Sequence, residues 1–180
     1  MTTCTPDHFW SGTITGCEPA LAPWLRDHGS LTLRIRQRCH EFRVRNLFDG
    51  MAPAPRDETA LLGVPSRRQV YTREVFLLAD SRPVVFAHSV VAAHHLRGAW
   101  RALQHLGERS LGSLLFTHPL VQRRPLHFRA LKPGDLLYRR AITCGAAAGS
   151  LWARRSLFTL HDAPLLVTEV FLPEILELHT

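Results

Sequence analysis

The run Pro164-Leu-Leu-Val-Thr-Glu-Val-Phe-Leu-Pro173 is apolar or uncharged except for Glu169. Such residues favour a β-strand, and the side chains of a strand alternate between two faces, so Glu169 shares a face with Leu165 and Val167. A carboxylate is seldom placed among aliphatic side chains unless a partner, a ligand or a reaction needs it there. The alternative is an edge strand whose glutamate reaches water.

A second run, Val70-Tyr-Thr-Arg-Glu-Val-Phe-Leu-Leu78, places Arg73 among strand-forming residues. Arg73 shares a face with Tyr71 and Val75, whereas Glu74 points to the opposite face. The planar guanidinium group of arginine can bind both oxygens of a carboxylate, although a structural ion pair is an equally open role. If the two runs are neighbouring strands facing one cavity, they form a dry anion-binding site with an acid/base group attached.

A third strand-like run, 151–160, contains the pair Arg154 and Arg155. The two-residue period of a strand sends these side chains to opposite faces. One of them could therefore face a pocket, and at least one is expected to be solvated or paired.

The remaining segments predict an α+β fold, with a mostly antiparallel sheet of about six strands, flanking helices and short turns. Helices are expected at 21–29, at 31–38 with Ser30 as the N-cap, and at 93–106. Strand-like segments are expected at 40–47, 68–78, 84–91, 121–131, 136–144, 151–160 and 165–172.

Length and composition favour one domain over residues 1–180, with 1–19 as a loosely ordered N-terminal extension. Residues 49–66 hold two glycines and three prolines and few strand formers. We expect this segment to be a long connection of the kind that often acts as a lid.

The net charge of +7 permits nucleic-acid binding, but its distribution argues against it. All basic residues except Lys132 are arginines, and they are dispersed in separate pairs without a long basic run. A small acidic ligand bound in a positive field fits the charge equally well. We therefore expect no nucleic-acid partner.

Several kinds of site find no support in the sequence. The four cysteines, Cys4, Cys17, Cys39 and Cys144, are scattered without a CxxC motif and are expected to be free thiols. No HExxH, GxSxG, GxGxxG or P-loop pattern occurs, so neither a metal nor a nucleotide is expected. With no signal peptide and no apolar run of roughly 20 residues, we expect a cytoplasmic protein without stable membrane insertion.

A set of short motifs extends from Trp24 to Pro173 in a specific order and spacing. The motifs are Trp24-Leu25, Gly29-Ser-Leu-Thr32, Arg73-Glu74 with Leu-Leu-Ala-Asp80, Ser89-Val-Val91, Leu106-Gly107, Leu111-Gly112, Leu115-Phe116, Trp152-Ala-Arg-Arg-Ser156 and Pro164 to Pro173. Together they resemble the chorismate–pyruvate lyase family of bacterial ubiquinone biosynthesis. Ala92 and Ser110 depart from the family pattern, since proline is common at both positions.

The resemblance implies a lyase that converts chorismate to 4-hydroxybenzoate and pyruvate in an internal ligand cavity, as a monomer and without a cofactor or metal. By position in the motifs, the substrate-binding residues are Leu31, Arg73, Leu111 and Glu169, and the catalytic residues are Arg73 and Glu169. The alternative is a non-catalytic effector-binding domain of the same fold. Such a domain normally accompanies a helix-turn-helix segment, and none is recognisable before Trp24.

Overall fold

The structure is a computed structural model that describes residues 9–144 and 149–178. Its α-helices are α1 (Ala22–Arg26), α2 (Leu31–Arg36), α3 (Arg56–Leu61), α4 (Leu111–Thr117) and α5 (Leu136–Ala141). Its 3₁₀-helices are η1 (Ala93–Arg97), η2 (Arg101–His105), η3 (Ile142–Cys144) and η4 (Pro173–Glu177). Its strands are β1 (Phe42–Pro53), β2 (Gln69–Ala79), β3 (Arg82–Val91), β4 (Gln122–Arg123), β5 (His127–Leu131), β6 (Leu151–Leu160) and β7 (Ala163–Phe171).

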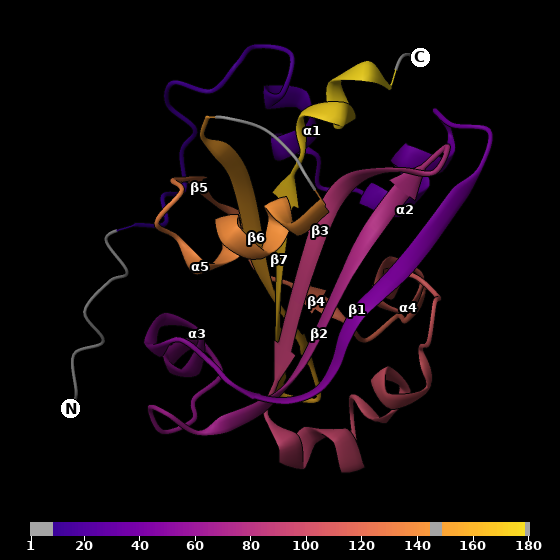
Figure 1. The fold of residues 1–180 in the computed structure, drawn as a ribbon. Coiled ribbons are helices and arrows are strands. Elements are labelled where there is room, and N and C mark those ends of the chain that lie inside the picture. The colour runs from indigo at the N-terminus through magenta and orange to yellow at the C-terminus, as the bar shows by residue number, and fades with distance from the viewer. Residues whose placement is uncertain (1–8, 145–148, 179–180) are drawn as a thin grey trace.

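The strands form one antiparallel seven-stranded sheet in the order β1-β2-β3-β7-β6-β4, with β5 also paired to β6 (Figure 1). The predicted α+β class and antiparallel sheet are therefore confirmed. The sheet has one strand more than the expected six or so because the segment 121–131 is broken around Pro125. Proline cannot donate to a strand ladder, so β4 and β5 pair with β6 separately.

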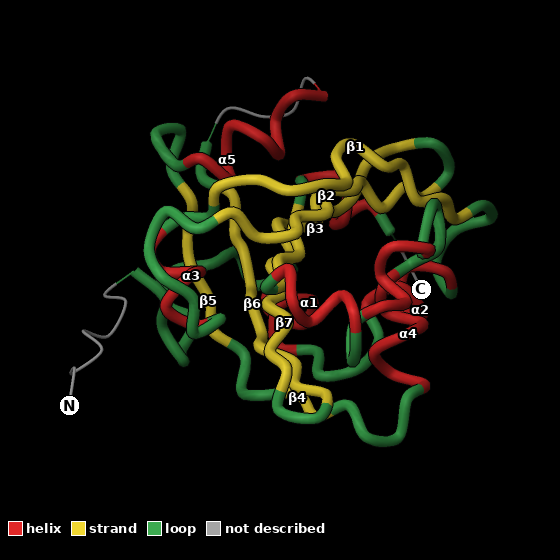
Figure 2. The backbone as a smooth tube through the Cα atoms, turned by 90° about the horizontal axis from the view of Figure 1, so that it is seen from below, coloured by secondary structure: helices red, strands yellow, loops and turns green. Residues whose placement is uncertain are grey.

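Helices cover both faces of the sheet. Figures 1 and 2 show α1, α2 and α4 on one face, with α3 and α5 on the other. On the first face, Val75 and Leu77 of β2 pack with Leu25 and Ile35 of the N-terminal helices. On the second face, Phe76 and Phe86 pack with Tyr138 and Ala141 of α5. The alternation predicted for β2 thus separates two hydrophobic cores.

Residues 49–66 are not the long irregular connection that we expected. The first five of them continue β1, which pairs with β2 from Asp49↔Arg73 to Pro53↔Gln69 beyond a bulge near Asn46. A bulge re-establishes pairing after an extra residue, and β1 lies at the edge of the sheet, where proline is tolerated. Residues 56–61 then form α3, which has acidic residues in its first turn.

Two other expectations about secondary structure were wrong. Residues 136–144 form α5 and η3 rather than a strand, and Tyr138 and Ala141 of α5 are buried at helical spacing. The expected helix 93–106 is instead two 3₁₀-helices, η1 and η2, with Gly98 between them. The helix at 31, by contrast, begins as predicted, because the Ser30 hydroxyl accepts a hydrogen bond from the Leu33 backbone N–H at 3.3 Å.

The N-terminal segment is in part attached to the sheet. Residues 1–8 of the expected extension lie outside the described residues, as do residues 145–148 of the glycine- and alanine-rich turn. Ser11 exchanges two backbone hydrogen bonds with Phe128 of β5, and Trp10 is buried.

Cys17 and Cys39 are free thiols, whereas Cys4 and the side chain of Cys144 lie outside the described part of the chain. None of the helices in the described ranges has the length and apolar character needed to span a bilayer.

Candidate active site

A small cavity lies between the sheet and the helices α2 and α4, on the first face of the sheet. Its volume is about 40 Å³, and it is lined by all four residues singled out in the sequence, Leu31, Arg73, Leu111 and Glu169. The other lining residues are Thr32, Val75, Leu77, Ala87, Ser89, Ser110, Gly112, Leu115, Phe116, Arg123, Arg154, Ser156, Phe158 and Val167. Side chains far apart in the sequence are therefore brought together here by strand pairing.

Arg73 is almost completely buried at this cavity, with 2% of its surface exposed. Its Nη2 donates to the backbone carbonyls of Gly107 at 2.8 Å and Arg109 at 3.0 Å. Its buried Nε has no acceptor among the described residues. Burial lowers the pKa of the guanidinium, and the nearby charge of Asp49 acts in the opposite direction. The carbonyls hold the side chain in place while further N–H donors remain for another group.

Glu169 is held in the cavity by Arg154, whose Nε donates to Glu169 Oε2 at 2.5 Å. The side chain of Arg154 is 1% exposed and that of Glu169 is 17% exposed. Arg154 Nη1 also donates to the carbonyls of Trp24 at 3.0 Å and Asp27 at 2.6 Å, at the end of α1. The edge-strand alternative for Glu169 is therefore wrong, since β7 lies between β3 and β6 and the carboxylate is paired.

Arg154 and Arg155 do point to opposite faces of the sheet, as the alternation predicts. Arg155 Nη1 donates to Asp57 Oδ2 of α3 at 2.8 Å, and its guanidinium lies 4.3 Å from the ring centroid of Trp10. Both arginines are buried and paired.

Arg123 is a cavity residue that sequence reasoning missed, because it counted only as one member of a dispersed arginine pair. It belongs to the two-residue strand β4, whose neighbour Arg124 is exposed. The alternation that separates Arg154 from Arg155 applies here too, but a two-residue strand leaves no pattern to recognise. Burial lowers the pKa of Arg123, with the charge of Glu169 acting against that effect.

The charges lining the cavity are unbalanced in favour of anions. Arg73, Arg123 and Arg154 contribute guanidinium groups, whereas Glu169 contributes the single carboxylate among the lining residues. The excess positive charge and the unused N–H donors favour an anionic ligand. Leu31 and Leu111 are the first residues of α2 and α4, where a backbone N–H has no acceptor within its own helix.

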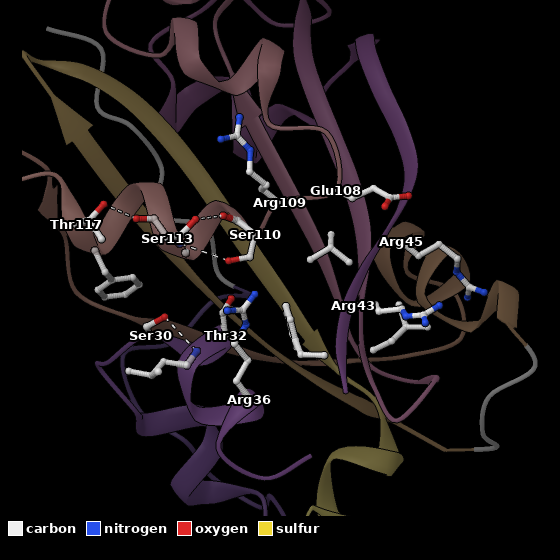
Figure 3. Close-up of a pocket in the computed structure, with 16 residues that line it drawn as sticks. Ser30, Thr32, Arg36, Arg43, Arg45, Glu108, Arg109, Ser110, Ser113 and Thr117 are labelled. Atoms are coloured by element: carbon white, nitrogen blue, oxygen red, sulfur yellow. Dashed lines mark hydrogen bonds between the residues drawn. The ribbon is translucent and has the colours of Figure 1, made fainter. Parts of the chain in front are cut away.

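An open groove of about 910 Å³ adjoins the cavity and lies between α2 and α4 on one side and the edge strand β1 on the other. Figure 3 shows Ser30 and Thr32 at α2 across from Ser110 and Ser113 at α4. Cavity and groove share Thr32, Ser110, Gly112 and Phe116 among their lining residues. A Cβ atom added to Gly112 would lie 3.1 Å from Thr32 Oγ1, so the helices approach closely only because residue 112 is glycine. We call this close approach of the two helices, which borders both the cavity and the groove, the α2–α4 seam.

The opposite face of the sheet carries a second buried polar cluster. His88 Nδ1 lies 2.8 Å from Glu74 Oε1, His88 Nε2 lies 3.2 Å from a carboxylate oxygen of Glu58, and Arg140 also bonds Glu74. Burial alone would lower the pKa of His88, but the hydrogen bonds and charges of the two glutamates outweigh it and raise the pKa to about 9. The opposite charges of this cluster satisfy one another, so we assign it a structural role.

A single α+β domain with a pocket lined by three arginines and one carboxylate has the features of a binding site for a small organic anion. The family model for chorismate lyase matches residues 9–179. The chain belongs to the chorismate lyase family and is therefore a lyase, so the family predicted from the sequence motifs is confirmed.

The chain is similar to two relatives in sequence and to one solved structure in fold. A probable chorismate pyruvate-lyase of Nitrosospira multiformis is 48% identical over 94% of this chain and 95% of the relative. A probable chorismate pyruvate-lyase of Nitrosomonas europaea is 50% identical over 94% of this chain and 96% of the relative. The crystal structure of the effector domain of PhnF from Mycobacterium smegmatis has a TM-score of 0.55 at 16% identity, covering 81% of this chain and 90% of that one. At such low identity the last likeness shows the fold alone.

Proposed function

We propose that this enzyme converts chorismate to 4-hydroxybenzoate and pyruvate, in the cytoplasm and as a monomer, as a step towards ubiquinone. The observation that carries the proposal is the cavity in which Arg73 and Glu169 lie together with two further arginines. Chorismate is a dianion with a carboxylate on its ring and another on its enolpyruvyl ether. Its charge complements three guanidinium groups and one carboxylate.

The proposed reaction is an elimination that breaks the bond between ring C3 and the ether oxygen. The ring also loses the hydrogen on C4, so that it becomes aromatic and is released as 4-hydroxybenzoate. Enolpyruvate takes up the proton and becomes pyruvate. Because aromatisation makes the reaction favourable, the enzyme has to orient the dianion and stabilise the charge that grows on the departing oxygen.

Arg73 is proposed to bind a substrate carboxylate. Its Nη2 is fixed by the Gly107 and Arg109 carbonyls, while its Nε, which has no acceptor among the described residues, is available to a ligand. The backbone N–H groups of Leu31 and Leu111, at the starts of two helices that border the cavity, are proposed as further donors to the substrate.

Glu169 has a different role in each of two possible routes. In the first, its carboxyl group carries the moving proton towards the leaving oxygen as an acid/base catalyst. In the second, the methylene group of the substrate collects the proton in a concerted step, and Glu169 only orients the substrate. The bond from Arg154 fixes the position of the carboxylate in either route.

The proposal is tested by mixing the purified protein with chorismate and measuring 4-hydroxybenzoate and pyruvate. Arg73→Ala and Glu169→Ala should each lower kcat/KM by about 100-fold or more, the scale expected of charge-stabilising and acid/base groups. Arg68→Ala and Glu18→Ala, at exposed positions, are matched controls that should keep wild-type rates. A near-wild-type rate in either cavity variant would remove that residue from its proposed role.

Glu169→Gln separates the two routes. Glutamine keeps the size of the side chain and an acceptor for Arg154 but cannot exchange a proton. If Glu169 is an acid/base group, the glutamine variant should be as slow as the alanine variant, whereas an orienting role predicts that glutamine preserves most of the rate. Wild-type protein that binds 4-hydroxybenzoate but forms no product from chorismate would favour the effector-binding alternative.

A further inference from the structure

The three arginines of the cavity differ in how many of their donors are already occupied. Arg154 has two of its three nitrogens engaged, since its Nε bonds Glu169 and its Nη1 bonds backbone carbonyls at the end of α1. Arg123 donates from Nη1 to the His28 carbonyl at 2.9 Å, while its Nε is buried without an acceptor in the described part of the chain. Arg123 therefore resembles Arg73 in keeping a buried Nε donor for a ligand, whereas the Nε of Arg154 is bonded to Glu169.

The guanidinium group of Arg123 is held in position by aromatic rings. Its Cζ lies 5.7 Å from the ring centroid of Phe116 and 5.3 Å from that of Phe158. Phe158 is also its backbone partner across the β4–β6 ladder. Stacking on two rings restricts the rotamers of a long side chain, so a ligand bound by Arg123 has less side-chain entropy to overcome.

The order of the strands places Arg123 and Arg73 on opposite sides of Glu169. Arg73 lies on β2, Glu169 on β7 and Arg123 on β4, in a sheet ordered β2-β3-β7-β6-β4. All three residues line the same cavity. A substrate with a carboxylate near each end can therefore contact both arginines while its middle lies beside Glu169.

We propose that Arg123 binds the carboxylate of the enolpyruvyl group and makes the enzyme selective for a dianion over a monoanion. The inference rests on the proposed function for the identity of that carboxylate. Arg123 is within the electrostatic reach of Glu169 and lines the same cavity. In the acid/base route, the departing oxygen, which belongs to the enolpyruvyl group, lies next to Glu169. The ring carboxylate, which remains in the product, then lies at Arg73.

The test compares two aromatic probes that cannot undergo elimination. The first is 3-carboxymethoxy-4-hydroxybenzoate, which has two carboxylates, and the second is 3-methoxy-4-hydroxybenzoate, which has only the ring carboxylate. Calorimetric titration gives the Kd of each probe for wild type, Arg123→Gln, Arg73→Gln and the control Arg124→Gln, whose arginine is exposed. Wild type and the three variants form thermodynamic cycles in which the effect of the second carboxylate is isolated.

Wild type and Arg124→Gln should bind the dicarboxylate about ten- to a hundredfold more tightly than the monocarboxylate, the scale of one charge-assisted hydrogen-bonded pair. In Arg123→Gln this preference should fall to near unity, while the affinity for the monocarboxylate stays within about threefold of wild type. Arg73→Gln should weaken both probes by a similar factor. The Lys variant, Arg123→Lys, should restore part of the preference, because it keeps the charge but loses the planar fork.

An unchanged preference in Arg123→Gln would overturn the proposal, and so would an equal loss of affinity for both probes. The latter result, accompanied by a lower melting temperature, would show that Arg123 only supports the loop at His28. Because neither probe is turned over, these outcomes are independent of lyase activity. Suppose that wild type failed to convert chorismate but that the preference for the dicarboxylate probe was present in wild type and absent from Arg123→Gln. The proposed function would then fail, and the role of Arg123 in binding the second carboxylate would stand.

Discussion

Replacement of Arg154 by methionine should lower the free energy of unfolding by about 3–5 kcal/mol, the usual cost of removing one partner from a buried ion pair. The variant would leave the Glu169 carboxylate, only 17% exposed, without its cation. It would also remove the donor to the carbonyls of Trp24 and Asp27. Each buried acceptor left without a donor adds to the cost.

The prediction is measured by urea unfolding and by thermal melting. For a chain of this size, a loss of about 3–5 kcal/mol corresponds to a decrease in Tm of roughly 6–20 °C. The exposed Arg124→Met is the matched control and should change the free energy of unfolding by less than about 0.5 kcal/mol.

A second variant tests the reason for the loss. If the unpaired carboxylate is the main cost, the double variant Arg154→Met with Glu169→Met should lose less unfolding free energy than the two single variants lose in total. The difference should be about 1–3 kcal/mol. The reasoning is refuted if Arg154→Met costs less than about 1 kcal/mol, or if the two substitutions are simply additive.

Two further predictions concern the opposite face of the sheet and the α2–α4 seam. The pKa of His88 is about 9 in the folded protein against 6.5 ordinarily, so its stabilising effect, up to about 3 kcal/mol, is complete below pH 6.5 and is lost as the pH rises through 9. Urea unfolding from pH 6 to 10 should show this fall in the free energy of unfolding, and His88→Gln should flatten it. If the free energies of wild type and His88→Gln fell with pH in parallel, the assignment would be contradicted. Gly112→Ala places a methyl group 3.1 Å from Thr32 Oγ1, which should destabilise the closed seam by about 1–3 kcal/mol and speed the release of 4-hydroxybenzoate in stopped-flow measurements. Adding Thr32→Ala should restore slow release, and an unchanged rate in Gly112→Ala would show that ligands leave by another route.

The parts of the fold that the sequence predicts well are those in which a local pattern decides the structure. Strands β6 and β7 follow from two runs of strand-forming residues on either side of the turn at Asp162. Residues 136–144 were misassigned because a short apolar segment after a turn fits a strand or a helix equally well. The second half of β1 was missed because Gly50 and Pro53 disfavour a strand locally, and only pairing with β2 makes them extended.

The same distinction applies to the site. Arg73 and Glu169 are visible because each is an ionisable residue inside an apolar run. Arg123 is not, because it lies in a two-residue strand whose place beside β6 is set by tertiary pairing. The assembly of cavity residues from β2, β4, β6 and β7 depends on strand order, which no local pattern specifies.

The pairing of β3 with β7 has a consequence for biosynthesis. The ladder from Val85↔Phe171 to Val91↔Leu165 joins two central strands that are far apart in the sequence. Pairing over such a separation gives the fold a high contact order, which makes folding slow. While the ribosome is still producing the second half of the chain, the nascent β1–β2–β3 meander exposes an unpaired edge, β3, that is rich in valine. Unprotected edges of this kind aggregate, so we expect the newly made chain to depend on chaperones until residue 171 has emerged.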